Sequence, residues 1–139
     1  TNQLLEPISQ ASKLTSLTLP EMNADDETVK LLARLTNLTK LNLQSVDLSN
    51  ADASPLAACT KLEVLDLSET NLGDAGMATI GKLTNLVEIT LPKTLTDAGL
   101  EILAKLPRLR NASLYRCESL SDGAVAKLKA ARPDLRIGR

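Results

Sequence analysis

Apolar residues recur along the chain in one pattern, L-x-x-L-x-L, in which polar residues separate the apolar ones. A pattern that returns at a fixed step indicates an architecture of stacked, similar units. The pattern occupies Leu14/Leu17/Leu19, Leu38/Leu41/Leu43, Leu62/Leu65/Leu67, Leu86/Ile89/Leu91 and Leu109/Ala112/Leu114. Successive units start 24, 24, 24 and 23 residues apart, and a shortened copy, Leu135-Arg-Ile137, begins 26 residues after the last.

Each unit has two halves with different periods. The first half alternates apolar with polar residues, which predicts a short strand with one buried face. In the second half, after Asp74, apolar residues fall at Met77, Ile80 and Leu83, which predicts a short helix with one face turned inward. The same spacing recurs at Val29/Leu32/Leu35, Ala53/Leu56/Cys59, Leu100/Leu103/Leu106 and Val125/Leu128/Ala131.

An acidic or amide residue stands where each helix is predicted to begin. These residues are Asp26, Asn50, Asp74, Asp97 and Asp122. Because such side chains accept hydrogen bonds from the free N–H groups at a helix start, we expect them to cap the helices. In the second unit Ser54-Pro55 is an alternative cap and first helical residue, so that helix would start late.

A strand and a helix of this length cannot bury their apolar faces alone, whereas stacked units bury a shared core. The strands then form one parallel sheet with the helices outside it. Because helices are bulkier than strands, the stack curves and the sheet lines its concave face.

The residues around each strand carry a family resemblance. L-x-x-L-x-L followed by Thr70, Thr94 or Cys117 resembles the leucine-rich repeat. The segments Leu72-Gly-Asp-Ala-Gly-Met77, Leu95-Thr-Asp-Ala-Gly-Leu100 and Leu120-Ser-Asp-Gly-Ala-Val125 resemble its cysteine-containing, ribonuclease-inhibitor-like type, found in bacterial repeat proteins and F-box proteins. The closing segment, residues 124–137, is similar to the ends of bacterial members. Met22 and Val46 depart from the pattern, since Asn, Cys or Thr is usual there, so we expect a gap in the polar ladder.

The resemblance implies an α/β fold, a right-handed solenoid of about five leucine-rich repeats with a concave parallel sheet and short convex helices. Residues 1–139 would form a single domain. Residues 1–13 would be the trailing helix of an earlier or capping repeat, with repeats starting near 14, 38, 62, 86 and 109 and a terminal strand near 135–137.

Composition argues against catalysis. The chain has 139 residues and no histidine, so the commonest general base and metal ligand are absent. No Ser or Cys nucleophile has a histidine base, and no phosphate-binding loop of the G-x-x-x-x-G-K-[ST] kind occurs. We therefore expect no enzyme activity, no cofactor and no metal. No run approaches the roughly 20 apolar residues of a membrane-spanning helix, so no membrane insertion is expected.

The charges divide the chain into two ends. The formal net charge is −1, but residues 1–103 carry a net −7 and residues 104–139 a net +6. The basic end is typical of a polar terminal cap, or of head-to-tail association with an acidic neighbour. A nucleic-acid interface is disfavoured, because Tyr115 is the only aromatic residue available for base stacking.

The two cysteines are expected to be structural. Cys117 occupies the turn position at which the family resemblance implies a buried thiol, and Cys59 lies on an inward helix position. Because they lie two units apart on different parts of the repeat, a disulfide between them is not expected.

The outward positions of the strands are the candidate binding surface, since the resemblance implies protein partners on the concave face. Tyr115, Arg116 and Arg110 stand out because Tyr and Arg are frequent interface hot spots. The acidic group Glu63, Asp66, Glu69 and Glu88 would suit a basic partner, or would be a solvated face. The candidate partner-binding residues are Asn42, Gln44, Asp66, Glu69, Glu88, Lys93, Arg110, Tyr115 and Arg116. We expect a monomeric, non-catalytic protein-interaction module; the alternative is a structural spacer or assembly module that acts through its oppositely charged ends.

Overall fold

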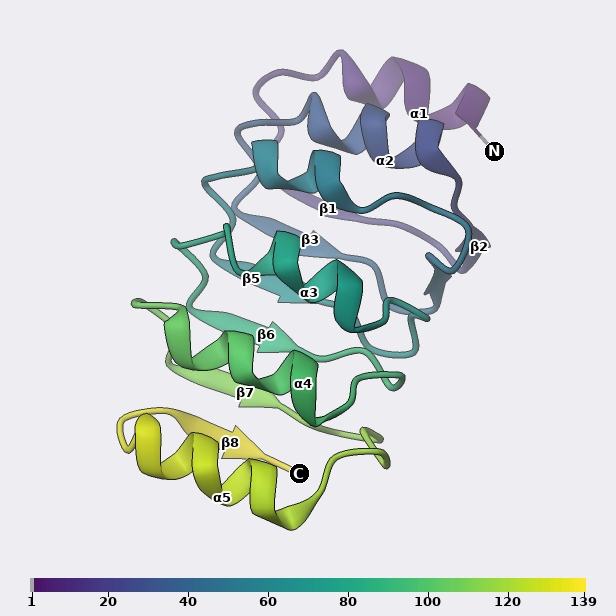
Figure 1. Ribbon diagram of the computed structural model, residues 1–139. Helices are drawn as coiled ribbons and strands as arrows, with labels where there is room; N and C mark the ends of the chain where they lie inside the picture. Colours follow the sequence, from purple (N-terminus) through teal and green to yellow (C-terminus); the bar gives the residue numbers. More distant parts are fainter. Residues whose placement is uncertain (1) are drawn as a thin grey trace.

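The computed structural model describes residues 2–139, as a stack with a helical layer on one side and a parallel sheet on the other (Figure 1). The α-helices are α1 (Asn2–Ser9), α2 (Asp26–Ala33), α3 (Asp74–Ile80), α4 (Asp97–Leu100) and α5 (Asp122–Ala131), and the 3-10 helices are η1 (Ser54–Ala58) and η2 (Glu101–Lys105). The strands are β1 (Ser16–Thr18), β2 (Met22–Asn23), β3 (Lys40–Asn42), β4 (Val46–Asp47), β5 (Val64–Asp66), β6 (Glu88–Thr90), β7 (Asn111–Ser113) and β8 (Arg136–Gly138).

The main sheet follows the order β1-β3-β5-β6-β7-β8, and every neighbouring pair is parallel. Its register aligns equivalent residues of successive units: Leu41 pairs with Leu65, and Leu65 with Ile89. Their side chains point toward the helices, so the flanking polar residues of each strand point to the uncovered side. The predicted parallel sheet with short helices is confirmed.

The core is a column of aliphatic side chains between the two layers. Leu65, Leu67, Ile80 and Leu83 of one unit are all fully buried, and the equivalent positions of its neighbours are buried with them. Burying one such side chain stabilises the fold by about 1.5–3 kcal/mol. Leu and Ile fill the core without an aromatic residue because each unit adds only a thin layer.

At the N-terminal end, α1 packs against α2. It lies within the segment 1–13 that was predicted to be a trailing helix. The first residue of that segment, Thr1, lies outside the described residues.

The predicted helix caps are wrong in detail. Asp26, Asp74, Asp97 and Asp122 are the first residues of their helices and not the residues before them. The side chains that cap are those of Asp25, which accepts from the Thr28 backbone N–H, and Ser121, which accepts from that of Ala124. Asn50 lies in a turn ahead of η1, which begins late at Ser54. The late start agrees with the alternative for this unit, but Ser54 is the first residue of η1 and not its cap, because Ala53 precedes it without a capping side chain.

Three of these acids bind the following unit instead. Asp26 accepts a hydrogen bond from the backbone N–H of Asp52 at 2.7 Å. Asp97 accepts from the Ser121 backbone N–H at 2.8 Å and from its hydroxyl at 2.6 Å. Asp74 accepts in the same way from the backbone N–H and the hydroxyl of Thr96. The acid column therefore links one unit to the next.

The turn position after each strand shows a second form of linkage between units. Where Met22 and Val46 replace the usual polar residue, their backbones pair in the small parallel sheet β2–β4. In later units the side chains act instead: Thr94 donates to the Leu72 carbonyl of the preceding unit at 2.9 Å, whereas Thr70 donates at 2.7 Å to the Leu67 carbonyl of its own unit. Backbone pairing thus replaces the side-chain ladder at the N-terminal end.

Candidate functional site

The uncovered face of the sheet is hollowed. A depression of about 430 Å³ runs across β1, β3, β5, β6 and β7. The charged residues that line it are Lys40, Asp66 and Glu88, and the remaining polar lining comes from Ser, Thr and Asn side chains. The hollow therefore lies on the sheet face that was predicted to be concave.

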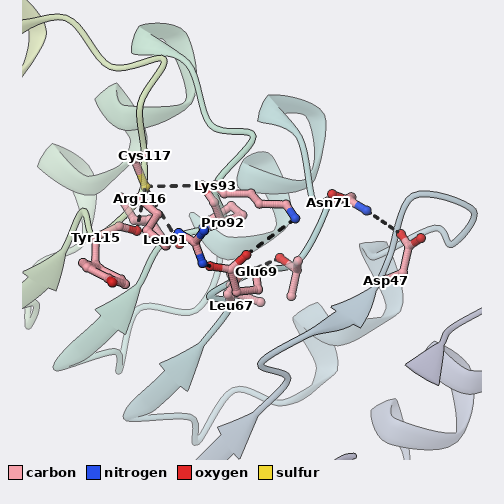
Figure 2. A network of polar contacts seen from close by, with 11 residues as sticks. Asp47, Leu67, Glu69, Asn71, Leu91, Pro92, Lys93, Tyr115, Arg116 and Cys117 are labelled. Carbon is pink, nitrogen blue, oxygen red and sulfur yellow. Dashed lines mark hydrogen bonds and ion pairs between the residues drawn. The ribbon is translucent and has the colours of Figure 1, made fainter. Parts of the chain in front are cut away.

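The predicted site residues fall into two groups around this hollow. Asn42, Asp66 and Glu88 line its floor. Glu69, Lys93, Tyr115 and Arg116 belong to the loops that leave the strands at their carboxyl ends, and these loops form one rim of the sheet (Figure 2). Gln44 lies in the equivalent loop after β3, and Arg110 directly precedes β7.

Three of the rim residues form an ion-paired group that we call the rim cluster: Glu69, Lys93 and Arg116. The Arg116 Nη1 atom lies 2.7 Å from Oε1 of Glu69, and the Lys93 Nζ atom lies 3.6 Å from Oε2 of the same carboxylate (Figure 2). Arg116 is 47 residues beyond Glu69 and reaches it across the intervening unit. The Glu69 side chain is only 24% exposed, whereas those of Lys93 and Arg116 are 43% and 58% exposed.

The backbone of the rim is held in an uncommon conformation. Ser45, Glu69 and Arg116 have φ values of 61°, 58° and 62°, in the left-handed region that favours glycine. Each stands two residues after the leucine that directly follows its strand. For Glu69 and Arg116 the turn is closed by a backbone hydrogen bond from Thr70 to Leu67 and from Cys117 to Leu114. The cost for a residue with a Cβ atom is about 1–2 kcal/mol. The surrounding structure therefore holds Glu69 and Arg116 in place.

Sequence reasoning missed this backbone feature. Neither Gly nor Asn, the residues that mark such turns, occupies these positions. The only signal is their common place after the strand in three units.

Tyr115 lies on the same loop as Arg116 and is 65% exposed. Figure 2 shows its ring turned away from Glu69. Its backbone N–H lies 3.4 Å from the hydroxyl oxygen of Ser113, two residues earlier. The same short turn occurs in two other units, where the backbone N–H of Ser68 donates to the Asp66 side chain and that of Gln44 donates to the Asn42 side chain. Tyr115 is thus a large, exposed aromatic surface on an ordered loop.

Several candidate residues also have local structural roles. Asp66 accepts hydrogen bonds from the backbone N–H and the hydroxyl of Ser68, at 2.9 and 2.6 Å, which fixes the loop that leads to Glu69. Arg110 forms an ion pair with Asp134 at 3.0 Å, and Glu88 accepts from the Asn111 amide at 3.4 Å. Arg110 and the rim cluster lie at opposite ends of the strands, so the structure does not bring them together.

Both cysteines are free and buried. The Cys59 Sγ atom lies 3.6 Å from the Leu32 carbonyl oxygen, and that of Cys117 lies 3.4 Å from the Pro92 carbonyl oxygen (Figure 2). Burial raises the pKa of both thiols, so each stays protonated and unreactive at neutral pH.

Among residues 2–139, no group of three or more His, Cys, Asp or Glu side chains is arranged to hold a metal ion. The helices of this part of the chain are all too short or too polar to cross a membrane. The arrangement on the sheet face can form ion pairs, hydrogen bonds and an aromatic contact.

Comparison of the sequence with protein-family models gave no match, and comparison with curated proteins gave none either. Solved structures are similar. Internalin C2 of Listeria monocytogenes superposes with a TM-score of 0.67 at 23% identity, over 96% of this chain and 54% of that protein. A leucine-rich repeat protein of Leptospira interrogans superposes with a TM-score of 0.67 at 18% identity, over 96% of this chain and 33% of the Leptospira chain.

The chain therefore has the α/β solenoid fold of bacterial leucine-rich repeat proteins. It spans about half the length of the first of these structures and a third of the second. The ribonuclease-inhibitor-like type, the right-handed course and the number of repeats stay predictions.

Proposed function

We propose that this protein is a non-catalytic protein-interaction module that binds its partner on the uncovered face of the sheet. The observation that carries the proposal is the rim cluster, an ordered group of charged residues with an exposed tyrosine beside it, at the edge of a hollow. The fold supports it, because leucine-rich repeat proteins generally act as interaction modules.

The rigidity of this face favours binding. Ordering a long side chain at an interface costs about 0.5–1.5 kcal/mol, and here the ion pairs with Glu69 already restrict Lys93 and Arg116. The turns that carry Glu69 and Arg116 are closed by backbone hydrogen bonds from Thr70 to Leu67 and from Cys117 to Leu114. A partner would therefore meet a surface close to its bound arrangement.

Tyr115 is the residue whose removal we expect to cost most. Truncation of an interface hot spot typically costs about 2 kcal/mol or more, which corresponds to at least about 30-fold in affinity. Because the side chain is 65% exposed, Tyr115→Ala should leave the thermal unfolding midpoint unchanged. Leu4→Ala is the matched control, since Leu4 is also a large exposed apolar residue, 76% exposed, but lies on α1 in the helical layer.

The experiment begins with crosslinking in the source cells, which identifies the partner, and then measures its affinity for purified variants. Tyr115→Ala and the charge reversal Arg116→Glu should each weaken binding, whereas Leu4→Ala and Lys105→Glu, on the helical side, should not. The reversals Asp66→Lys and Arg110→Glu test the hollow and the opposite end of β7. A partner that binds all sheet-face variants as well as the parent would contradict the proposal.

The alternative is an assembly module that acts through its ends. It draws support from the sheet, in which β1 and β8 each pair on one side only within the described residues, and from the exposed Leu4 near the first of these ends. Copies that stacked head to tail would form open chains. Light scattering at high protein and low salt separates the two proposals: a growing mass supports assembly, and a constant monomer mass excludes it.

A further inference from the structure

We propose that the rim cluster binds a carboxylate side chain from an acidic segment of the partner. This inference rests on the proposed function and names the chemistry of the partner at one place on the sheet face. The carboxylate would be shared between the exposed sides of Lys93 and Arg116, next to the ring of Tyr115.

The geometry of the cluster leaves donors for such a group. Glu69 engages Arg116 through one oxygen and Lys93 through the other, and each contact uses a single nitrogen of the cation. An arginine has five N–H donors and a lysine has three. In the described part of the chain, neither cation has a second carboxylate within ion-pair distance.

The exposure of the three side chains indicates that the free N–H donors of Lys93 and Arg116 face the solvent. Glu69 is the least exposed of the three and lies beneath the two cations, which are about twice as exposed. Because both oxygens of Glu69 are already engaged, an incoming anion meets cationic groups first. A planar guanidinium also suits a carboxylate, to which it can donate two parallel hydrogen bonds.

The local charge agrees with this assignment. Two cations around one carboxylate leave a net charge of +1 in the rim cluster. Hydrogen bonds from the backbone N–H of Ser49 and the amide of Asn71, at 2.9 and 3.0 Å, lower the pKa of Asp47 in an earlier unit. Lys93 lies near enough to contribute to this lowering of the pKa but forms no ion pair with Asp47 within residues 2–139.

A nucleic acid would fit this face less well than an acidic protein segment. Single-stranded nucleic acids need stacking platforms along a continuous basic groove, and here Tyr115 is the only aromatic residue. The adjoining hollow carries Asp66 and Glu88, which would repel a phosphate backbone that continued across the sheet. A protein can place one carboxylate on the rim and polar or basic groups over the hollow.

The test is an NMR titration of the ¹⁵N-labelled protein with an octaglutamate peptide in about 50 mM salt, where exposed charges are weakly screened. We expect saturable shifts that are largest at the backbone amides of Lys93, Tyr115 and Arg116. The double variant Lys93→Gln/Arg116→Gln should weaken binding by up to about 30-fold, since each of the two exposed ion pairs contributes up to about 1 kcal/mol.

The matched control is Lys105→Gln/Lys129→Gln, which removes the same charge on the helical side and should leave the affinity unchanged. Equal weakening by this control, or shifts spread over all basic residues, would overturn the inference. Tighter binding of octalysine, or equal binding of an octathymidylate at the same amides, would also overturn it. If the natural partner still requires Tyr115 after such a result, the inference fails while the proposed function stands.

Discussion

Glu69 and Arg116 combine an unfavourable backbone conformation with a favourable ion pair. Each has a positive φ that costs about 1–2 kcal/mol, and their side chains meet at 2.7 Å across a whole unit. An exposed ion pair returns at most about 1 kcal/mol, so the pair alone does not explain the conformation. The turns that close on Leu67 and Leu114 hold it, and the ion pair follows.

Gly99 illustrates at the residue scale how close the units lie. A Cβ atom at this position would overlap the carboxylate of Asp74 and the side chain of Leu95. Asp74 cannot move away without losing its hydrogen bonds to Thr96. The glycine of the Asp-Ala-Gly segment therefore makes room for the acid of the preceding unit.

Gly99→Ala should accordingly destabilise the protein by about 1–3 kcal/mol, the usual cost of overpacking. Gly123→Ala is the control, because the nearest atom to its added Cβ is the Ser121 hydroxyl at 3.8 Å, and a helical alanine replaces a helical glycine in α5. It should raise stability by up to about 1 kcal/mol. Urea unfolding measures both; equal effects of the two substitutions would refute the close contact at Gly99.

At the scale of elements, short helices are stabilised by contacts with their neighbours. α4 has four residues, too few to persist alone, yet its first residue, Asp97, receives two hydrogen bonds from Ser121, which itself caps α5. At the N-terminal end, the Asp25 side chain and Thr28 form a capping box at the start of α2. Hydrogen bonds to carboxylates thus fix the first turns of these helices, within α2 at Asp25 and between α4 and α5 at Asp97.

The hydrogen bonds to these carboxylates predict a loss of stability in acid. The backbone and side chain of Thr28 lower the pKa of Asp25 to about 2, the Ser121 hydroxyl and N–H lower the pKa of Asp97, and the Arg132 guanidinium lowers that of Asp134 to about 2. In the unfolded chain an aspartate has a pKa of about 3.9. Their stabilisation is therefore complete above that pH and is lost as the pH falls toward about 2.

We expect the thermal unfolding midpoint to be nearly constant from about pH 7 to 5 and to fall between about pH 5 and 2. Asp25→Asn should lower the midpoint at neutral pH and make this acid slope shallower. Glu27→Gln, in the same first turn of α2, is the control for the loss of a carboxylate there and should lower the midpoint at neutral pH by less than Asp25→Asn does. Scanning calorimetry across this pH range provides the measurement; an unchanged slope for Asp25→Asn would count against this origin of acid sensitivity.

At the scale of the whole molecule, the stack behaves as a nearly one-dimensional object. Each unit contacts the units on either side, so a central unit is held from two directions and a terminal one from a single direction. The N-terminal helix α1 packs against α2 and contains Pro7, which cannot donate a helical hydrogen bond. Local stability should be lowest there.

Native-state hydrogen exchange should reveal this gradient. Amides of α1 should exchange fastest among the helices, and those of the central strands β5 and β6 should approach the protection set by global unfolding. Leu65→Ala, at a fully buried position of β5, should cost about 2–5 kcal/mol and lower the protection of its neighbours as well. Uniform protection from α1 to β6 would contradict a stack with independent local openings.

The sequence alone predicts the elements, because the information for them is local. The change from period 2 to helical spacing places a strand at Leu62–Leu67 and a helix after Asp74, and Ser54-Pro55 marks the late start of η1. The absence of glycine-type turn residues at Glu69 and Arg116 gives no local signal for their positive φ.

The tertiary structure decides which residues of different units meet. Asp97 looks like a cap in the sequence, but stacking places Ser121 of the next unit within its reach. In the sequence Glu69 and Arg116 are separate candidates. The stacking of successive units places the Arg116 Nη1 atom 2.7 Å from the Glu69 Oε1 atom, two units away. Contacts between residues 22 to 47 positions apart depend on the spacing and register of neighbouring units, which no single repeat encodes.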